Sequence, residues 1–207
     1  MRAVRSWQRL RPRPRITLLG WETGFYRAER ELGVHIERRL DQSFLGVPLF
    51  NAIVERANNS DATITVLINS DIILYQYFMT AFLKVASSIR YFLVVLARFD
   101  LDDLPPHLHD AAADEDEVRD YVWRKGTLRT YGGMDVWAWN TNGPRLFNPI
   151  MSHFVFGRGK YDNWLTHETI VAQRRHVVDI SETCLASHVR NDHSVVPGSS
   201  SDDSANK

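Results

Sequence analysis

The chain has 207 residues, of which 44% are apolar and 24% charged, and its 25 basic and 25 acidic side chains give a formal net charge of zero. This balance is typical of a globular protein with a sizeable core, and it excludes a strong overall field that would draw the chain to nucleic acid or to an anionic membrane. The single cysteine, Cys184, excludes an internal disulfide.

The two ends of the chain differ in composition from the rest. The first 15 residues hold six arginines and no acid, and 197–207 is rich in Ser and Asp. No apolar run reaches about 18 residues and no signal-peptide core is present, so we predict no membrane span and a soluble protein, either cytoplasmic or, if processed, in the Golgi lumen. We predict one domain over 1–196 and a disordered tail over 197–207.

Short apolar runs alternate with segments of helical periodicity. Strands are predicted at 15–19, 63–68, 91–96, 176–180 and 185–189, and helices at 25–32, 49–57, 78–89, 116–124 and 162–173. The unbroken run TITVLI at 63–68 predicts a central buried strand, and the acidic segment 101–113, which contains two prolines, predicts a loop. The alternation predicts an α/β domain with a mostly parallel sheet covered on both faces.

A polar turn follows the apolar run at 63–68. Asn69 and Asp71 stand two residues apart there, in the segment NSDII. Ligands of parallel sheets sit at the carboxyl ends of strands, and oxygen-bearing side chains at this spacing can face a Mg²⁺ or Mn²⁺ ion that takes its other ligands from water and phosphates. Asn and Asp also favour ordinary turns, so a plain strand-to-loop turn is the alternative.

Asp162 lies between aromatic residues in the segment YDNW, where a helix is predicted to begin. A carboxylate in such surroundings is partly desolvated and can act as a general base toward an acceptor hydroxyl. The alternative is a helix N-cap. Arg158 and Lys160 precede it, and they either neutralise a leaving diphosphate or form a solvated basic turn.

The histidines give weaker signals. His107 and His109 have no further ligand at a useful spacing, so we interpret them as loop residues. His188 and His193 lie at the end of the last predicted strand and beyond it, where a histidine can complete a metal site that begins at Asp71. A structural role is the alternative. No phosphate-binding glycine loop, serine-nucleophile elbow or nucleic-acid module is recognisable.

Several segments resemble, in order, a family of glycosyltransferase-like, nucleotide-diphospho-sugar transferase proteins. They are 3–24, 46–51, 69–73, 132–137, 157–165 and the stretch from 178 to 192, and together they extend over nearly all of the chain up to about His193. The segment YDNW is the most specific of them.

The resemblance implies the A-type glycosyltransferase fold, a single Rossmann-like domain, and transfer of a sugar from a nucleoside-diphosphate sugar to a hydroxyl of a glycan, protein or small-molecule acceptor. It implies Mn²⁺ or Mg²⁺ held by Asn69, Asp71 and His188, with His193 as the second choice, and Asp162 as the catalytic carboxylate. The residues implied to bind the nucleotide part are Gly46, Pro48, Asn51, Arg158 and Lys160, and those implied to bind the sugar and the acceptor are Asp135, Trp137, Asn163 and Trp164.

The chain departs from the family pattern in two ways. One carboxylate of the metal motif is the amide of Asn69, and an amide binds a hard cation less well. The chain also begins at the helix that normally follows the first strand, so we expect that strand to be missing. These departures favour an alternative function, a non-catalytic domain that binds a sugar nucleotide or a carbohydrate. A protein that binds a partner through its basic start and acidic middle is a third, weaker hypothesis.

Overall fold

The computed structural model describes residues 1–109, 113–129, 133–146, 153–158 and 161–190. The predictions for Lys160, His193 and the tail 197–207 lie outside these ranges. The helices are α1 (Arg2–Arg9), α2 (Thr23–Leu32), α3 (Phe50–Asn58), α4 (Gln76–Ser88), α5 (Glu115–Lys125), α6 (Tyr161–Val171) and the 3₁₀ helix η1 (Pro106–His109). The strands are β1 (Thr17–Leu19), β2 (His35–Glu37), β3 (Ile64–Ile68), β4 (Ile73–Leu74), β5 (Phe92–Ala97), β6 (Phe99–Leu101), β7 (Thr127–Leu128), β8 (Met134–Asn140), β9 (His176–Asp179) and β10 (Ala186–Val189).

The predicted α/β class is confirmed, but the mostly parallel sheet is wrong. The main sheet has the order β3-β8-β5-β9, and β8 runs antiparallel to both neighbours, whereas β5 and β9 are parallel. A second sheet, β4-β10-β6-β7, is also mixed, and β1 pairs with β2 in parallel. The alternation of helices and strands breaks down between α5 and β8. No helix lies in the described part of that connection, and a parallel crossover usually needs one.

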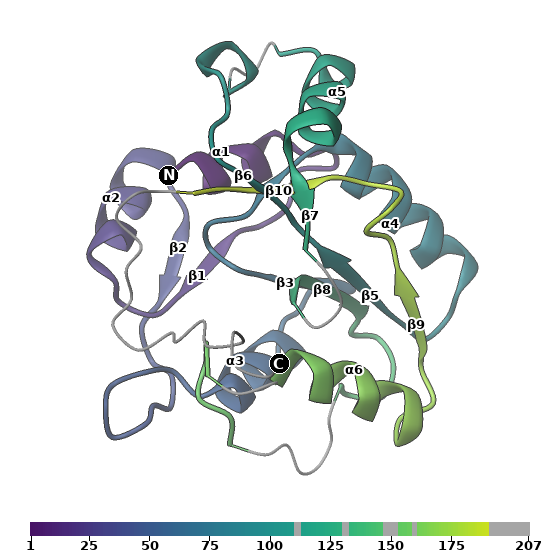
Figure 1. Ribbon diagram of the computed structural model, residues 1–207. Coiled ribbons are helices and arrows are strands. Elements are labelled where there is room, and N and C mark those ends of the chain that lie inside the picture. The colour runs from purple at the N-terminus through teal and green to yellow at the C-terminus, as the bar shows by residue number, and fades with distance from the viewer. Residues whose placement is uncertain (110–112, 130–132, 147–152, 159–160, 191–207) are drawn as a thin grey trace, which may run out of the picture.

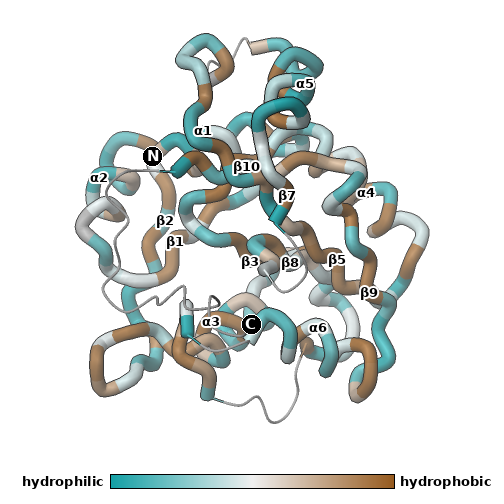
Figure 2. Tube along the Cα trace, in the orientation of Figure 1, coloured by the Kyte–Doolittle hydropathy of each residue, from teal (hydrophilic) through white to brown (hydrophobic). Residues whose placement is uncertain are grey.

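Burial follows position in the main sheet. All six residues of β5 are buried, and six of the seven in β8. Strand β3 was predicted to be central, but it lies at the edge of the sheet and each of its residues is only partly buried. The β-branched apolar run at 63–68 therefore predicted a strand correctly, but its predicted position at the centre of the sheet was wrong. Figure 2 shows the hydrophobic run along β5.

Helices cover both faces of the main sheet (Figure 1). On one face, α3 and α6 pack against the side chains of β5 and β8 that point toward them, in a cluster that includes Phe50, Trp137, Trp139 and Leu165. On the other face, α1 and α4 contribute a second cluster with Trp7, Phe78 and Phe82. The alternation along β8 decides this, because successive side chains of a strand point to opposite faces.

The basic start of the chain is part of the domain. It forms α1, a helix as the family resemblance implied, with Ala3, Val4 and Trp7 buried. The indole Nε1 of Trp7 donates a hydrogen bond of 2.8 Å to the carbonyl of Ile72, which ties the helix to the segment that follows β3. The arginines Arg2, Arg5 and Arg9 lie at the other positions of the helix.

We expect Cys184 to be unreactive in the native protein. Its side chain is 2% exposed, and burial raises the pKa of the thiol to about 12, so almost no thiolate is present at pH 8. A colorimetric thiol reagent should therefore react only after a denaturant is added. Complete reaction within minutes in native buffer would show that the region around Cys184 opens readily.

Candidate functional site

Three strand ends meet at one end of the main sheet. Ile68, the last residue of β3, pairs with Val136 of β8, and Ala97, the last of β5, pairs with Met134 of β8. The residues next to these pairs are therefore brought together, although they come from separate parts of the chain. Sequence reasoning placed Asn69 at this end but had no means of placing β8 beside it.

Asp135 is the centre of this strand-end group. Its Oδ1 accepts hydrogen bonds of 2.8 Å from Nδ2 of Asn69 and 2.8 Å from Nη1 of Arg98, and the backbone of Asn69 donates to the Asp135 carbonyl at 3.1 Å. The Asp135 side chain is only 3% exposed, and its other oxygen, Oδ2, is buried without a hydrogen-bond partner among the described residues.

Strands of the second sheet add Asp100 and His188 to this strand-end group. Strands β6 and β10 are parallel and place Asp100 opposite His188. Arg98 Nε donates to Asp100 Oδ1 at 2.8 Å, and His188 Nδ1 lies 3.1 Å from the same oxygen. On the other side of the imidazole, His188 Nε2 lies 3.3 Å from Oδ2 of Asp71, in the turn after β3.

We name these six residues the carboxylate–histidine network: Asn69, Asp71, Arg98, Asp100, Asp135 and His188. The sequence predicted four of them as site residues, and the structure brings all four into one network. Arg98 and Asp100 were not predicted as site residues. Arg98 directly follows the buried strand β5, so the strand-end rule used for Asn69 would have found it.

The network carries an excess of negative charge. Three carboxylates face one guanidinium, which leaves two negative charges when His188 is neutral. Burial opposes ionisation of Asp71, but the hydrogen bond from His188 and its charge outweigh burial and lower the pKa of Asp71. Burial also opposes ionisation of Asp100, and Arg98 and His188 together lower its pKa. Of the three carboxyl groups, only that of Asp135 has a raised pKa, because its burial outweighs Arg98 and Asn69.

The two nitrogens of His188 have different partners. When the ring is protonated, Nδ1–H donates to Asp100 and Nε2–H donates to Asp71, whose side chain is 52% exposed; in the neutral ring with the proton on Nδ1, Nε2 carries the lone pair that a metal ion needs. A carboxylate that holds one imidazole nitrogen while the other binds a metal is the usual outer-shell arrangement of metal-binding histidines. Among the described residues, however, no group of three or more His, Cys, Asp or Glu side chains converges on a metal position. Asp71 and His188 thus fit as two ligands of an ion completed by water and phosphate oxygens.

We expect Asp71 to raise the pKa of His188. The hydrogen bond to Asp71 raises this pKa, burial and Arg98 oppose it, and the net shift is upward. The stabilising contribution of the ion pair is therefore complete below the usual histidine pKa and is lost as the pH rises through the folded-state value. Following the His188 ring signals by NMR in metal-free protein should show a lower pKa in Asp71→Asn than in wild type. Equal pKa values would exclude the contact with Asp71.

A second group of predicted residues comes together beside α3. The segment 46–51 pairs with 154–158: the N–H of Phe50 donates to the Phe154 carbonyl at 2.7 Å, and the N–H of Phe156 donates to the Pro48 carbonyl at 3.0 Å. This pairing places the predicted nucleotide-binding residues Gly46, Pro48 and Asn51 in a segment next to the one that ends with the exposed Arg158. The Oδ1 atom of Asn51 is buried with no hydrogen-bond partner among the described residues.

Asp162 is the second residue of α6, since the helix begins at Tyr161. Its Oδ1 accepts the backbone N–H of Asn163 at 2.9 Å. Tyr161 connects this region to the network, because burial, Asp162 and Asp135 together raise the pKa of its hydroxyl to about 12. The ring of Tyr161 packs near that of Trp137, which lies two residues after Asp135 in β8, so α6 begins against the strand that carries Asp135.

The predicted aromatic contacts are distributed between core and surface. Trp137 is fully buried, and its ring centroid lies 6.1 Å from that of Phe50 and 6.3 Å from that of Tyr161. Trp164 is partly buried against Phe154, with centroids 5.3 Å apart, and its neighbour Asn163 is exposed. Trp137 thus stabilises the wall behind the site, whereas Trp164 and Asn163 are accessible.

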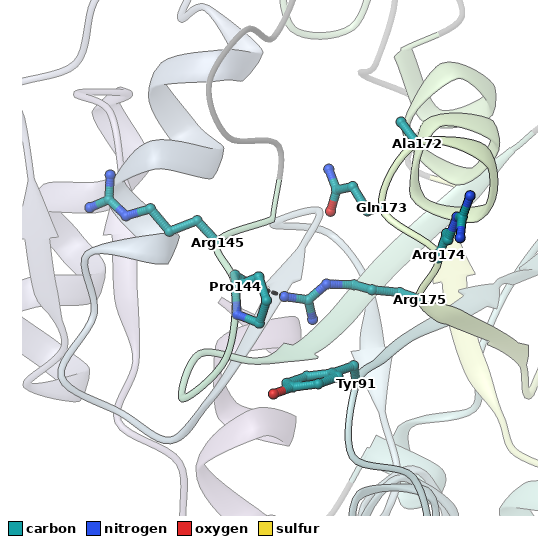
Figure 3. A pocket seen from close by; sticks show the side chains of 7 residues that line it. All are labelled: Tyr91, Pro144, Arg145, Ala172, Gln173, Arg174 and Arg175. Atoms are coloured by element: carbon teal, nitrogen blue, oxygen red, sulfur yellow. Dashed lines mark hydrogen bonds between the residues drawn. The ribbon is translucent and has the colours of Figure 1, made fainter.

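Two cavities of about 330 Å³ are found in the described part of the protein, and none of the predicted site residues lines either of them. Both include Tyr91, at the opposite end of the main sheet from the network. Figure 3 shows the first of them, bounded by Pro144 and Arg175.

No protein-family model matches this chain, and no curated protein matches it. The helices in the described ranges include none with the length and apolar character needed to cross a bilayer.

Proposed function

We propose that the protein is a metal-assisted glycosyltransferase that moves a sugar from a nucleoside-diphosphate sugar to an acceptor hydroxyl. The observation that carries the proposal is the contact of Asp71 with His188 Nε2 at 3.3 Å, with Nδ1 of the same ring on Asp100. The sequence predicts both Asp71 and His188 as metal ligands. The A-type glycosyltransferase fold and its Rossmann-like description belong to this proposal as well.

Asp71 and His188 are the side chains that would hold Mn²⁺ or Mg²⁺. A divalent cation there would neutralise charge on the diphosphate leaving group. Asp100 fixes the orientation of the imidazole, and Arg98 balances the charges of Asp100 and Asp135. The excess negative charge of the network favours a cation and, without one, would repel a diphosphate.

The remaining residues have roles on either side of this centre. Asp162 accepts the proton of the acceptor hydroxyl, and the exposed Arg158 is the cation proposed to contact the diphosphate. The Oδ2 atom of Asp135 has no hydrogen-bond partner among the described residues, and a sugar hydroxyl is the donor proposed for it. Trp164 and Asn163 provide an accessible aromatic face and an amide for the acceptor.

Binding without turnover is the second candidate. The amide of Asn69 donates to Asp135, so this residue already has a role in holding the network together. Such a site needs only to bind a sugar nucleotide. Release of the nucleoside diphosphate distinguishes the two functions, because a binding domain would not produce it.

The proposal is tested by screening sugar nucleotides for release of nucleoside diphosphate, with Mn²⁺ and with a chelator. A glycosyltransferase should release the diphosphate only with the cation. Binding of a sugar nucleotide without release, in the presence of several acceptors, would support the binding domain instead. A protein that binds none of the sugar nucleotides and releases no nucleoside diphosphate from them would contradict both functions.

We expect Asp71→Ala to weaken metal-dependent binding of a nucleoside diphosphate more than Asn69→Ala does, by about tenfold or more, because a carboxylate binds a hard cation better than an amide. Calorimetry with Mn²⁺ present and with a chelator measures the difference. Asp102→Ala is the matched control, since Asp102 is exposed and pairs with Arg190 rather than with the network. A larger loss in Asn69→Ala would mean that the motif has been misread.

A further inference from the structure

A pocket of about 330 Å³ lies at the end of the main sheet away from the network. The residues described as lining it are Tyr91, Pro144, Arg145, Ala172, Gln173, Arg174 and Arg175. Three of these seven are arginines and none is acidic. Because carboxylates usually accompany clustered arginines on a protein surface, the lining points to an anion as the missing partner.

Arg175 is the fixed cation of this pocket. It is only 6% exposed, and Nη1 donates to Oδ1 of Asn140 at 3.1 Å and to the carbonyl of Phe92 at 3.4 Å, while Nη2 donates to the carbonyl of Pro144. All three acceptors are neutral. Burial lowers the pKa of Arg175, and no carboxylate of the described residues pairs with it. A buried guanidinium without a counter-ion is costly, and an anionic ligand would reduce that cost.

The rim supplies further groups for a ligand. The backbone of Arg174 has a φ of 50°, in the left-handed region that residues other than Gly and Asn rarely adopt. In Figure 3 the side chains of Arg145 and Arg174 lie on either side of Arg175 and extend away from it. Nη2 of Arg145 donates to Oδ1 of Asn59, whereas Arg174 is exposed and can change rotamer on the picosecond-to-nanosecond scale to contact an anion without backbone movement.

Gln173 and Tyr91 give the pocket a hydrogen-bond acceptor and an aromatic wall in addition to its positive charge. The Oε1 atom of Gln173 is buried and has no hydrogen-bond partner among the described residues, so it can accept from a hydroxyl of a ligand. The ring of Tyr91 lies below Arg175 in Figure 3. A Cβ on Gly143 would lie 2.4 Å from this ring, which shows how closely the turn after β8 packs against it and fixes that wall.

We propose that this pocket binds a hydroxylated small molecule that carries a phosphate or a carboxylate, with the anion on the arginines and a hydroxyl on Gln173. The site is separate from the proposed transfer site. Phe92 begins β5 and Asn140 ends β8, whereas the network lies at the other ends of these strands. Five residues of strand separate the two ends, roughly 16 Å. The proposal does not depend on the glycosyltransferase assignment.

Binding of three probes to the full chain tests the proposal: inorganic phosphate, glucose 6-phosphate and glucuronate. Calorimetry measures the affinities, and NMR locates the probe through the ring signals of Tyr91. Glucose 6-phosphate or glucuronate should bind more tightly than inorganic phosphate, because only these two carry sugar hydroxyls that can reach Gln173 while the anion lies on the arginines. A preference for glucose 6-phosphate identifies the anion as a phosphate, and a preference for glucuronate identifies it as a carboxylate.

The variant that decides is Arg174→Asn, because Asn tolerates a positive φ and removes the charge without new backbone strain. It should weaken binding by about tenfold, the scale of one charge-assisted hydrogen bond. Arg124→Gln, an exposed change on α5, is the matched control and should bind as wild type does. No binding of any probe at up to about 10 mM, or equal affinities in wild type and Arg174→Asn, would overturn the proposal. So would a probe that shifts His188 instead of Tyr91.

Discussion

Replacing Arg98 with methionine is expected to lower the free energy of unfolding by about 3–5 kcal/mol at neutral pH, the usual scale for removing one partner of a buried charge pair. Methionine retains much of the volume of the arginine stem but removes two hydrogen bonds, to Asp100 and Asp135. The Asp135 side chain is 3% exposed and would be left buried with only Asn69 as a partner. Urea denaturation monitored by tryptophan fluorescence measures the loss.

The pH dependence and a second substitution identify the cause of this loss. Burial already raises the pKa of Asp135, and without Arg98 the native protein should take up a proton there more readily than the unfolded chain does. The deficit of Arg98→Met should therefore shrink as the pH falls toward the usual carboxyl range. Adding Asp135→Asn should recover part of the stability at pH 7. A loss of unfolding free energy that is the same at pH 7 and in the usual carboxyl range, and that Asp135→Asn does not change, would argue against a buried ion pair.

The Asp162→Asn variant is expected to lose sugar transfer by a factor on the order of 10² or more, while the affinity for the donor is retained. The amide keeps the shape of the side chain and removes the base. Asp162 lies in the first turn of α6, where a negative charge contributes only about 0.3–1 kcal/mol, so the melting temperature should change little. Initial rates and donor affinity, measured on the same preparation of each variant, separate catalysis from binding.

Glu168→Gln provides the matched control for this change, since it removes one carboxylate farther along the same helix. It should retain the transfer rate of wild type. An Asp162→Asn protein that transfers as fast as wild type would leave Asp162 with a structural role only. A large fall in stability of the same variant would show that the charge itself holds the start of α6.

Local patterns in the sequence were sufficient for most elements. The apolar run at 91–96 corresponds to β5, and the stripe at 49–57 corresponds to α3, each within one residue of its observed bounds. Short strands such as β4 and β7, with two residues each, have no periodicity to detect. The place of β3 at a sheet edge was also out of reach, because the same β-branched run suits an edge or a centre when its partners are unknown.

The candidate site, too, was predictable only as far as local sequence patterns reach. Asn69 and Asp71 were found because two polar residues follow an apolar run, and His188 because it ends another one. Their common network depends on Arg98 and on the register that sets Asp100 opposite His188. Such pairings between distant segments are not encoded in any local pattern. Arg175, which pairs with no carboxylate among the described residues, could likewise not be recognised from sequence as the cation of the pocket in Figure 3, since its burial arises only in the fold.

The most direct test of the proposed metal site is a measurement that locates bound Mn²⁺. Paramagnetic broadening of histidine ring signals, recorded with a nucleoside diphosphate and substoichiometric Mn²⁺, reports the distance from the ion to each imidazole. The account predicts that His188 broadens first, before the exposed His107 and His176, and that Asp71→Ala removes this selectivity. Broadening of His107 or His176 before His188, or the same selectivity in Asp71→Ala, would contradict a cation held by Asp71 and His188.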